Sequence, residues 1–265
     1  MKINSITAAY FSPTETTKQV VHKIVAGFDG APVKLLDVTG PEARKQQLHT
    51  GKDELLVIGV PVYMGRVPAL LGEWLSMIEA NVTPTVCVVV YGNRAYEDAL
   101  RELTKILAGQ GAAVVAGGAF IGEHSFSDDS TPSLGRPDQK DKSTAIKFGR
   151  DIRDKIESVV DSTEFTELDI PGNFPYGGIT ELWNVDFIAV GEQCTACGLC
   201  AEICPMAAIA PADSSSIDIH KCITCCACIK KCPQHARTMK PSPVKDAQGR
   251  INTLFTDRKE PECFL

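Results

Sequence analysis

Short apolar runs alternate with amphipathic stretches from about residue 3 to residue 161. The five runs are ITAAYF at 6–11, VKLLDV at 33–38, ELLVIGVPVY at 54–63, TVCVVVYG at 85–92 and AVVAGGAFIG at 113–122. Between the first two, apolar positions recur at helical spacing at Val20, Val21, Ile24 and Val25. We therefore predict five strands, a helix after the first of them, and further helices over residues 68–79, 96–107 and 137–160.

Strands that alternate with helices over about 150 residues predict an α/β domain with a doubly wound, five-stranded parallel sheet. The third and fourth runs are continuously apolar, which is typical of parallel strands buried on both faces. Ligands bind such sheets outside the carboxyl ends of the strands, where the strand order reverses. The loops after the first, third and fourth strands therefore form the candidate site.

The loop after the first strand, Ser12-Pro13-Thr14-Glu15-Thr16-Thr17, carries four hydroxyl groups and opens a helix. Backbone N–H groups, the helix dipole and hydroxyl donors then converge on one spot, as binding of a phosphate monoester requires. The loop has no lysine or arginine, and the GxxxxGK[ST] pattern of nucleoside triphosphate sites is absent. Simple capping of the helix by Ser12 or Thr14 is the alternative.

The loops after the third and fourth strands each place an aromatic ring beside a glycine. They contain Pro61-Val62-Tyr63-Met64-Gly65 and Tyr91-Gly92-Asn93, with Tyr96 close behind. Glycine lets the backbone approach a flat ligand, while a ring or an apolar side chain covers the face of that ligand. Each loop alone is an ordinary turn, but their shared position at the phosphate-loop edge predicts one common ligand.

A second kind of pattern begins at Cys194, where the run C-x-x-C-x-x-C-x-x-x-C-P is written twice. This spacing is typical of [4Fe-4S] ligands, and the fourth cysteine of each run binds the other cluster in two-cluster ferredoxins. We therefore predict two [4Fe-4S] clusters. One has the ligands Cys194, Cys197, Cys200 and Cys232, and the other has Cys222, Cys225, Cys228 and Cys204.

Zinc and disulfides are the alternatives for these cysteines. Structural zinc takes four ligands in two pairs and has no use for a third overlapping CxxC. Disulfide frameworks belong to small secreted chains, and the first residues, MKINSITAAYF, lack the features of a secretory leader. We expect Cys87 to be a small buried hydrophobic residue, Cys226 to be a non-ligand because the spacing is satisfied without it, and Cys263 to be a free thiol.

The chain has 265 residues, of which 44% are hydrophobic and 23% charged, so it has room for a domain of about 150 residues and a small second one. Its net charge is -6 and it has no basic block, so neither nucleic acid nor a membrane surface is an implied partner. No apolar run approaches the roughly 18 residues of a membrane helix. Eleven cysteines, eight of them predicted ligands, favour the reducing cytoplasm.

We predict four segments: 1–161, the α/β domain; 162–187, a linker or strap; 188–240, the small α+β cluster domain; and 241–265, a tail that has no strong pattern. Phe174, Tyr176 and Trp183 indicate that the strap packs on another part of the chain. His124 follows the fifth strand, where it either donates to a ligand, sits at the domain interface or ties down its own loop.

The segments YFSPTETT, PVYMGRVP, YGNRAYEDAL and AFIGEHSF, with GRPD before the last helix, resemble a flavodoxin-like domain. Residues 188–240 resemble a bacterial-type two-[4Fe-4S] ferredoxin. Together they resemble the fused flavodoxin/ferredoxin proteins of anaerobes, the EFR1-type ferredoxin family. The resemblance implies FMN, with its phosphate in the loop of Ser12, Thr14, Thr16 and Thr17 and its isoalloxazine between the loops of Tyr63, Met64 and Gly65 and of Tyr91, Gly92 and Asn93.

Glu15 departs from the flavodoxin pattern, which usually has glycine at this point. A carboxylate beside a phosphate dianion costs affinity unless it points to solvent. Glycine also adopts backbone conformations that glutamate adopts less readily.

The expected function is electron transfer between FMN and the two clusters, in anaerobic metabolism and with redox proteins as partners, either as monomer or as homodimer. One alternative is a flavin-dependent reductase of a small molecule, with polar groups such as Arg66, Arg94 or His124 above the isoalloxazine. Another is a non-enzymatic docking or redox-sensing protein with a vestigial flavin site. A GxGxxG fingerprint after the first strand is absent, so direct oxidation of a nicotinamide cofactor has the least support.

Overall fold

The computed structural model describes residues 1–178 and 184–265, apart from the side chain of Thr163, so Trp183 lies outside the described residues. Its main sheet has the order β2-β1-β4-β6-β7-β12. The strands are β1 (Ser5–Tyr10), β2 (Val33–Asp37), β4 (Glu54–Pro61), β6 (Pro84–Tyr91), β7 (Ala113–Ile121) and β12 (Glu262–Phe264). The first five pair in parallel. Their order, 2-1-3-4-5 counted along the first domain, is that of flavodoxin-like doubly wound sheets.

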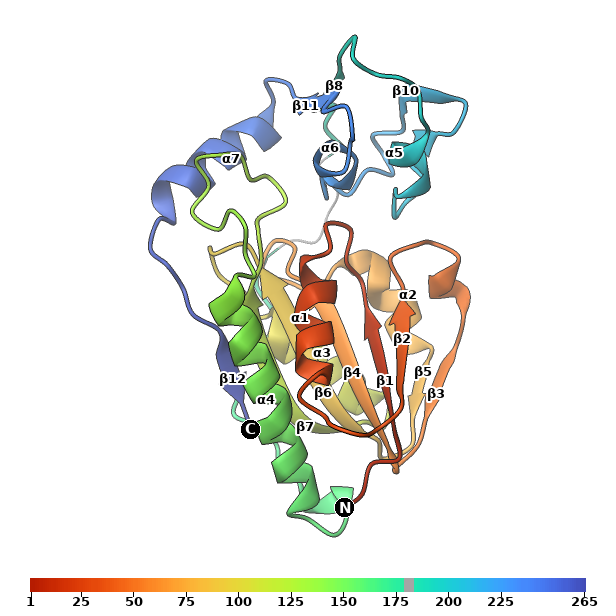
Figure 1. The fold of residues 1–265 in the computed structure, drawn as a ribbon, viewed down its shortest axis with the longest axis vertical. Helices are drawn as coiled ribbons and strands as arrows, with labels where there is room; N and C mark the ends of the chain where they lie inside the picture. Colours follow the sequence, from red (N-terminus) through yellow and green to blue (C-terminus); the bar gives the residue numbers. More distant parts are fainter. Residues whose placement is uncertain (179–183) are drawn as a thin grey trace.

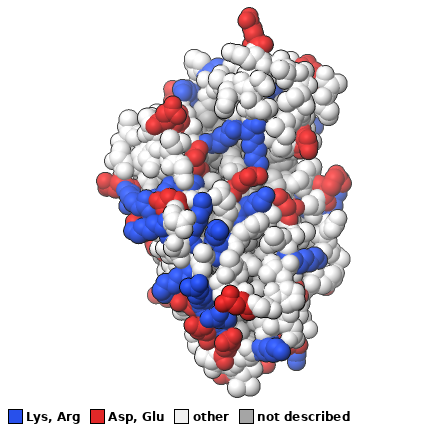
Figure 2. All heavy atoms as spheres, in the orientation of Figure 1, with Lys and Arg blue, Asp and Glu red and all other residues white. Residues whose placement is uncertain are grey.

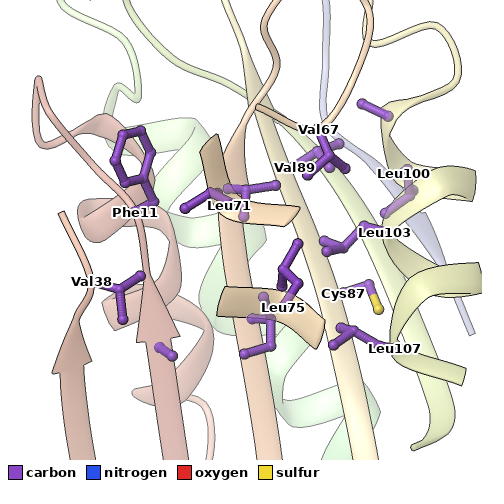
Figure 3. Packing of buried hydrophobic residues seen from close by; sticks show 14 of the residues in the cluster. Phe11, Val38, Val67, Leu71, Leu75, Cys87, Val89, Leu100, Leu103 and Leu107 are labelled. Carbon is purple, nitrogen blue, oxygen red and sulfur yellow. The ribbon is translucent and has the colours of Figure 1, made fainter. Parts of the chain in front are cut away.

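Helices cover both faces of this sheet (Figure 1). On one face α1 (Thr16–Val25) and α4 (Gln139–Glu157) pack on alternate residues of β1, β4 and β6 such as Ile6, Leu55 and Val86. On the other face α2 (Gly72–Ser76) and α3 (Ala99–Gly109) pack on the residues between them, as Figure 3 shows for Leu75, Leu103 and Cys87. The continuous apolar runs of β4 and β6 therefore contribute side chains to two hydrophobic cores, one on each face of the sheet.

The C-terminal tail adds what the sequence did not predict. After α7 (Pro243–Leu254), β12 runs antiparallel to β7, with Cys263 opposite Gly118. The sheet therefore has six strands in the described chain rather than the predicted five. A strand of three residues, Glu262–Phe264, has too few positions to show an alternating pattern, and only its pairing with an open sheet edge defines it.

Other departures are local. The predicted helix over 68–79 is broken into a 3-10 turn at Ala69–Leu71, α2 and the short strand β5 (Ile78–Ala80). β5 pairs in parallel with β3 (Leu48–Thr50) in a separate small sheet. Two further 3-10 turns lie at Ala43–Lys45 and Ser162–Glu164. Within the described ranges the helices are too short or too polar to cross a membrane.

Residues 184–240 form a small part that lies over the arrowhead ends of the parallel strands (Figure 1). It contains β8 (Ile188–Val190), α5 (Leu199–Glu202), β9 (Ile209–Ala210), β10 (Asp213–Ile217), α6 (Ala227–Lys230) and β11 (Arg237–Met239). β8 pairs with β11 and β9 with β10, both antiparallel. The small part therefore holds two short pairs of antiparallel strands and two single-turn helices. Each cysteine run supplies one of the helices.

Candidate functional site

A cavity of about 1020 Å³ opens at the carboxyl ends of the parallel strands. We call it the strand-end cavity. Its walls include the loops after β1, β4, β6 and β7 and so span the point at which the strand order reverses between β1 and β4. The predicted site residues that line it are Ser12, Thr14, Thr16, Thr17, Pro61, Val62, Tyr63, Met64, Tyr91 and Gly92. Glu15, Gly65, Asn93 and Tyr96 do not line it.

The loop after β1 is held by its own hydrogen bonds. The Ser12 hydroxyl accepts from the backbone N–H of Lys18 at 3.0 Å, and the Ser12 N–H donates to the Thr39 hydroxyl at 2.8 Å. Ser12 therefore caps the start of α1, as the capping alternative expected. The hydroxyl-bearing residues Thr14 and Thr16 line the cavity and supply neutral donors beside the positive end of the helix dipole.

Glu15 is the residue before α1 and has a left-handed backbone with φ 69°. This is the conformation that glycine adopts at low cost. Its carboxylate lies away from the cavity, 3.0 Å from the Lys231 ammonium and 3.8 Å from that of Lys18. The hydrogen bond with Lys231 lowers the pKa of Glu15 against the opposing effect of burial, so the side chain is anionic and already neutralised by two cations.

Asn93 and Tyr96 hold the tail instead of the cavity. The Asn93 amide nitrogen donates to the carbonyls of Phe255 and Asp257, each at 2.9 Å. The Tyr96 hydroxyl donates to Glu262 at 2.7 Å. Gly65 has φ 79° and packs against Glu97, where a Cβ would collide with the carboxylate. These three residues shape the loops from behind, a role that the sequence does not reveal because it depends on contacts between distant parts of the chain.

His124 and Phe126, in the loop after β7, also line the cavity. The His124 Nδ1 accepts from the Phe126 backbone N–H at 3.0 Å, so a neutral ring carries its proton on Nε2. Burial, followed by the charges of Lys230 and Arg94, lowers the pKa of His124 to about 4, so the ring is neutral near pH 7. Gly92 leaves room for this ring, because a Cβ at Gly92 would lie 2.2 Å from His124 Cδ2.

Helix α7 supplies a wall that the sequence analysis missed. The residues of its cavity face follow the spacing i, i+3, i+4, i+7 and i+8: Ala247, Arg250, Ile251, Leu254 and Phe255. This pattern is the signature of a one-sided helix, and it was visible in the tail. Gln248 donates to the Phe126 carbonyl at 2.5 Å, and the Asn252 carbonyl oxygen accepts from the Thr131 hydroxyl at 2.7 Å, so the middle and the last turn of the helix rest on the loop after β7.

The cysteines of the small part line two separate cavities. The first cysteine cavity is lined by Cys194, Cys197, Cys200 and Cys232, and also touches Cys228. The second cysteine cavity is lined by Cys204, Cys222, Cys225 and Cys228, with Cys226 beside them. Each cavity thus receives three cysteines of one run and the last cysteine of the other.

The two runs fold alike, offset by 28 residues as the positions of Cys204 and Cys232 show. The sulfur of Cys204 accepts from the Ala208 N–H and that of Cys232 from the Ala236 N–H, both at 3.3 Å. Gly198 and Cys226, at matching positions before the short helices, both have positive φ, 78° and 57°. Cys226 is therefore the equivalent of a glycine in the turn and not of a ligand.

Burial perturbs the thiols of Cys225 and Cys228. Burial raises the pKa of Cys225 and raises that of Cys228 to about 12, and Cys204 and Cys222 add to both shifts. In the described residues, no three His, Cys, Asp or Glu side chains stand as close as the ligands of a single ion.

Arg237, buried at 3% exposure, lines the first cysteine cavity, and its Nη1 has no hydrogen-bond partner among the described atoms.

The small part closes the strand-end cavity. Met206, Ile223 and Thr224 line that cavity, and Ile223 and Thr224 lie between the cysteines Cys222 and Cys225. Ile223 and Cys225 are buried in the same apolar cluster as Val60 and Tyr91 of the sheet. Cys225 also lies near the Tyr63 hydroxyl. Burial is the main cause that raises the pKa of Tyr63, and the negative charge of a Cys225 thiolate is the second. The second cysteine cavity therefore adjoins the strand-end cavity.

Polar contacts fix this arrangement. Lys230 lies 2.5 Å from Glu123, and Arg44 donates to the Pro205 carbonyl at 2.6 Å. Together with the ion pair of Lys231 and Glu15, these two contacts join the residues next to Cys204 and Cys232 to the first domain near the strand-end cavity. Figure 2 shows basic and acidic side chains facing one another at the junction between the two parts.

Comparisons with known proteins give weak structural likenesses. No protein-family model matches the chain, and no curated protein matches it. A flavodoxin from the domain Archaea is similar at 12% identity and a TM-score of 0.37, covering 58% of this chain and 99% of its own. Flavodoxin 2 from Bacillus cereus has 15% identity and a TM-score of 0.40 over 57% of this chain and 99% of its own. Rubredoxin oxygen:oxidoreductase from Desulfovibrio gigas has 12% identity and a TM-score of 0.42, covering 59% and 37%.

Proposed function

We propose that the chain is an electron-transfer flavo-iron-sulfur protein that passes electrons between FMN in the strand-end cavity and two [4Fe-4S] clusters in the cysteine cavities. When bound, FMN accepts one or two electrons and each cluster carries one. The observation that carries the proposal is the position of Ile223 and Thr224. These two residues stand within the second cysteine run and also form part of the strand-end cavity wall.

The residues fit FMN. Thr14 and Thr16 place hydroxyls at the start of α1 for the phosphate, with Ser12 and Thr17 behind them. Tyr63 and Met64 on one side and Tyr91 and Gly92 on the other supply apolar surface for a flat ring. Glu15 is turned away to Lys231, so its carboxylate does not oppose a phosphate.

The residues also fit two [4Fe-4S] clusters. Each cavity brings together the four cysteines predicted for one cluster, one for each iron of a cube, and one further cysteine beside them. The unpartnered Nη1 of Arg237 supports an anionic occupant in the first cysteine cavity, because a buried guanidinium N–H needs an acceptor. The backbone N–H groups of Ala208 and Ala236 donate to cysteine sulfurs, which would raise the potential of a bound cluster.

The geometry also orders the two clusters. The cluster of Cys204, Cys222, Cys225 and Cys228 would be proximal to FMN, since its cavity shares a wall with the strand-end cavity. The cluster of Cys194, Cys197, Cys200 and Cys232 would be distal, and Cys197 is exposed to solvent. A redox protein partner in the cytoplasm of an anaerobe would therefore exchange electrons at the distal cluster.

Anaerobic purification followed by an absorbance spectrum, an iron count and flavin extraction tests the proposal. We expect about eight irons per chain by the ligand count and near-stoichiometric FMN. A chain that binds zinc in place of iron, or that stays colourless after reconstitution with FMN, contradicts it. The colourless result favours the docking or sensing alternative with a vestigial flavin site.

A second function, reduction of a small molecule at the flavin, has one specific observation in its favour. Arg94 and His124 line the strand-end cavity as that hypothesis expected. Arg66 does not, because it forms an ion pair with Glu102 at 2.6 Å and stacks on Tyr176. Polar groups thus face the cavity on the side of the loops after β6 and β7.

A further inference from the structure

The strand-end cavity has walls that the proposed flavin contacts do not use. Its volume of about 1020 Å³ lies at the upper end of the roughly 300–1,000 Å³ of small-molecule pockets. The residues proposed for FMN come from the loops after β1, β4 and β6. The loop after β7 and the face of α7 form further wall that those contacts do not use.

This additional wall is apolar apart from a few polar side chains. Phe126, Ile251, Leu254 and Phe255 contribute to it, and Leu254 is 66% exposed although it sits on the cavity face of α7. Such an apolar surface, left open beside a proposed cofactor, suits the body of a small organic molecule.

Arg250 places a positive charge on the same face of α7. Arg94, the other arginine of the cavity, is paired with Glu97 at 2.5 Å. Arg250, by contrast, takes part in no ion pair and no side-chain hydrogen bond with the residues that the structure describes. A guanidinium presents paired N–H donors that match a carboxylate in a bidentate arrangement.

Helix α7 is anchored to the loops after β6 and β7. Its described polar anchors run to the loops after β6 and β7: Asn93 binds the Phe255 carbonyl, Gln248 binds the Phe126 carbonyl and Asn252 binds Thr131. The loop after β6 is one of the two proposed to enclose the isoalloxazine. Arg250 therefore lies on a helix anchored to a loop that we propose to border the flavin ring, and no described polar anchor of α7 is in the loop of Thr14 and Thr16.

We infer that the strand-end cavity contains a second binding site, between the flavin position and α7, for a small organic carboxylate with a flat apolar body. Arg250 binds the carboxylate, while Ile251, Leu254, Phe255 and Phe126 cover the body. The neutral ring of His124 adds no charge that would compete with Arg250 for the carboxylate. This inference rests on the proposed function, since it needs FMN in the same cavity.

A titration of the FMN-loaded protein with cinnamate tests the inference, with cinnamyl alcohol as the neutral analogue. We expect cinnamate to change the visible flavin absorbance in a saturable way without releasing FMN. Arg250→Gln should weaken cinnamate binding about tenfold or more, the loss expected for a hydrogen bond to a charged group. Arg250→Lys should recover part of that loss, and the alcohol should bind wild type and Arg250→Gln alike.

Lys142→Gln is the control for the loss of one positive charge, because Lys142 lies on α4 and outside the cavity. It should leave cinnamate affinity unchanged.

The inference is overturned if cinnamate leaves the flavin spectrum unchanged, displaces FMN, or binds Arg250→Gln as tightly as wild type. It is also overturned if Arg250→Gln weakens FMN but not riboflavin, since Arg250 then belongs to the phosphate site. A protein that retains no FMN overturns the proposed function as well, and the flavin content separates these cases.

Discussion

The carboxylate of Glu15 lies 3.0 Å from the ammonium group of Lys231. Glu15 precedes the helix of the proposed phosphate loop, and Lys231 precedes Cys232, a proposed ligand of the distal cluster. One ion pair thus joins the two proposed cofactor regions. It also explains how an acidic residue is accommodated in a loop that we propose to bind phosphate, because the negative charge is directed to the small part of the molecule.

Glu15→Gly should not destabilise the protein and should leave FMN affinity close to that of wild type, because the carboxylate already points to Lys231. The left-handed backbone at φ 69° costs a non-glycine residue roughly 1–2 kcal/mol, whereas a half-exposed ion pair contributes less than about 1 kcal/mol. Unfolding midpoints and FMN fluorescence titrations measure both effects. Glu15→Gln, which keeps the backbone cost and removes only the charge, is the control. A large loss of stability in Glu15→Gly would show that the ion pair matters more than the backbone.

Cys232→Ser should impair the cluster held by the first cysteine run, although Cys232 belongs to the second run. Cys232 lines the same cavity as Cys194, Cys197 and Cys200. We expect about four of the eight irons to be lost, measured by iron analysis of anaerobically purified protein. Cys226→Ala is the control and should keep all the iron, because Cys226 occupies the turn position equivalent to Gly198. Equal iron loss in both variants would contradict this ligand assignment.

Thr14→Ala and Thr16→Ala should each weaken FMN about tenfold, since a hydrogen bond to a charged group is worth about 1.5–3 kcal/mol. Riboflavin has no phosphate, so its affinity should stay as in wild type. Parallel titrations with the two flavins check this expectation. A matching loss for riboflavin would place the two threonines outside the phosphate site.

His124 should make the fold sensitive to acid. Its pKa is lowered to about 4 by burial and by Lys230 and Arg94, while an unfolded histidine titrates near ~6.5. The unfolded state therefore binds the proton first, and stability is lost as pH falls from about 6.5 toward 4. This histidine alone should cost about 2 kcal/mol at about pH 5.

Chemical unfolding of wild type and His124→Gln near pH 7 and again near pH 5 measures this contribution. Comparing the two pH values within each variant cancels any packing change that the substitution introduces. The drop between the two pH values should be smaller in His124→Gln. An equal drop in both proteins would mean that other groups dominate the acid response.

Much of the fold followed from the sequence because apolar patterning and strand burial are local signals. The runs that became β1, β4 and β6 are long and continuously buried, so their positions were predicted within a residue or two. β12 was missed because its three residues become a strand only by pairing with β7. Similarly, the helix predicted over 68–79 is shorter because Ile78–Ala80 pairs with Leu48–Thr50.

The candidate site was partly readable for the same reason. Loops at strand ends and cysteine spacing are visible in one stretch of sequence, as for Thr14 and Cys225. The contribution of α7 depends on tertiary contacts such as Asn93 with the Phe255 carbonyl. Asn93 and Tyr96 were placed at the ligand by analogy with neighbouring residues, yet their polar atoms bind the tail. Sequence alone gives no sign of which long-range partner a side chain selects.

The most direct test of the central claim, that electrons pass between FMN and the cluster next to it, is anaerobic stopped-flow reduction with dithionite. Flavin and cluster absorbance are followed together in the wild type and in Cys225→Ala, which should lose the proximal cluster. The account predicts that in the wild type the flavin is reduced in step with the clusters, and that Cys225→Ala slows flavin reduction markedly. Flavin that stays oxidised beside fully reduced clusters, or that is reduced equally fast in Cys225→Ala, contradicts it.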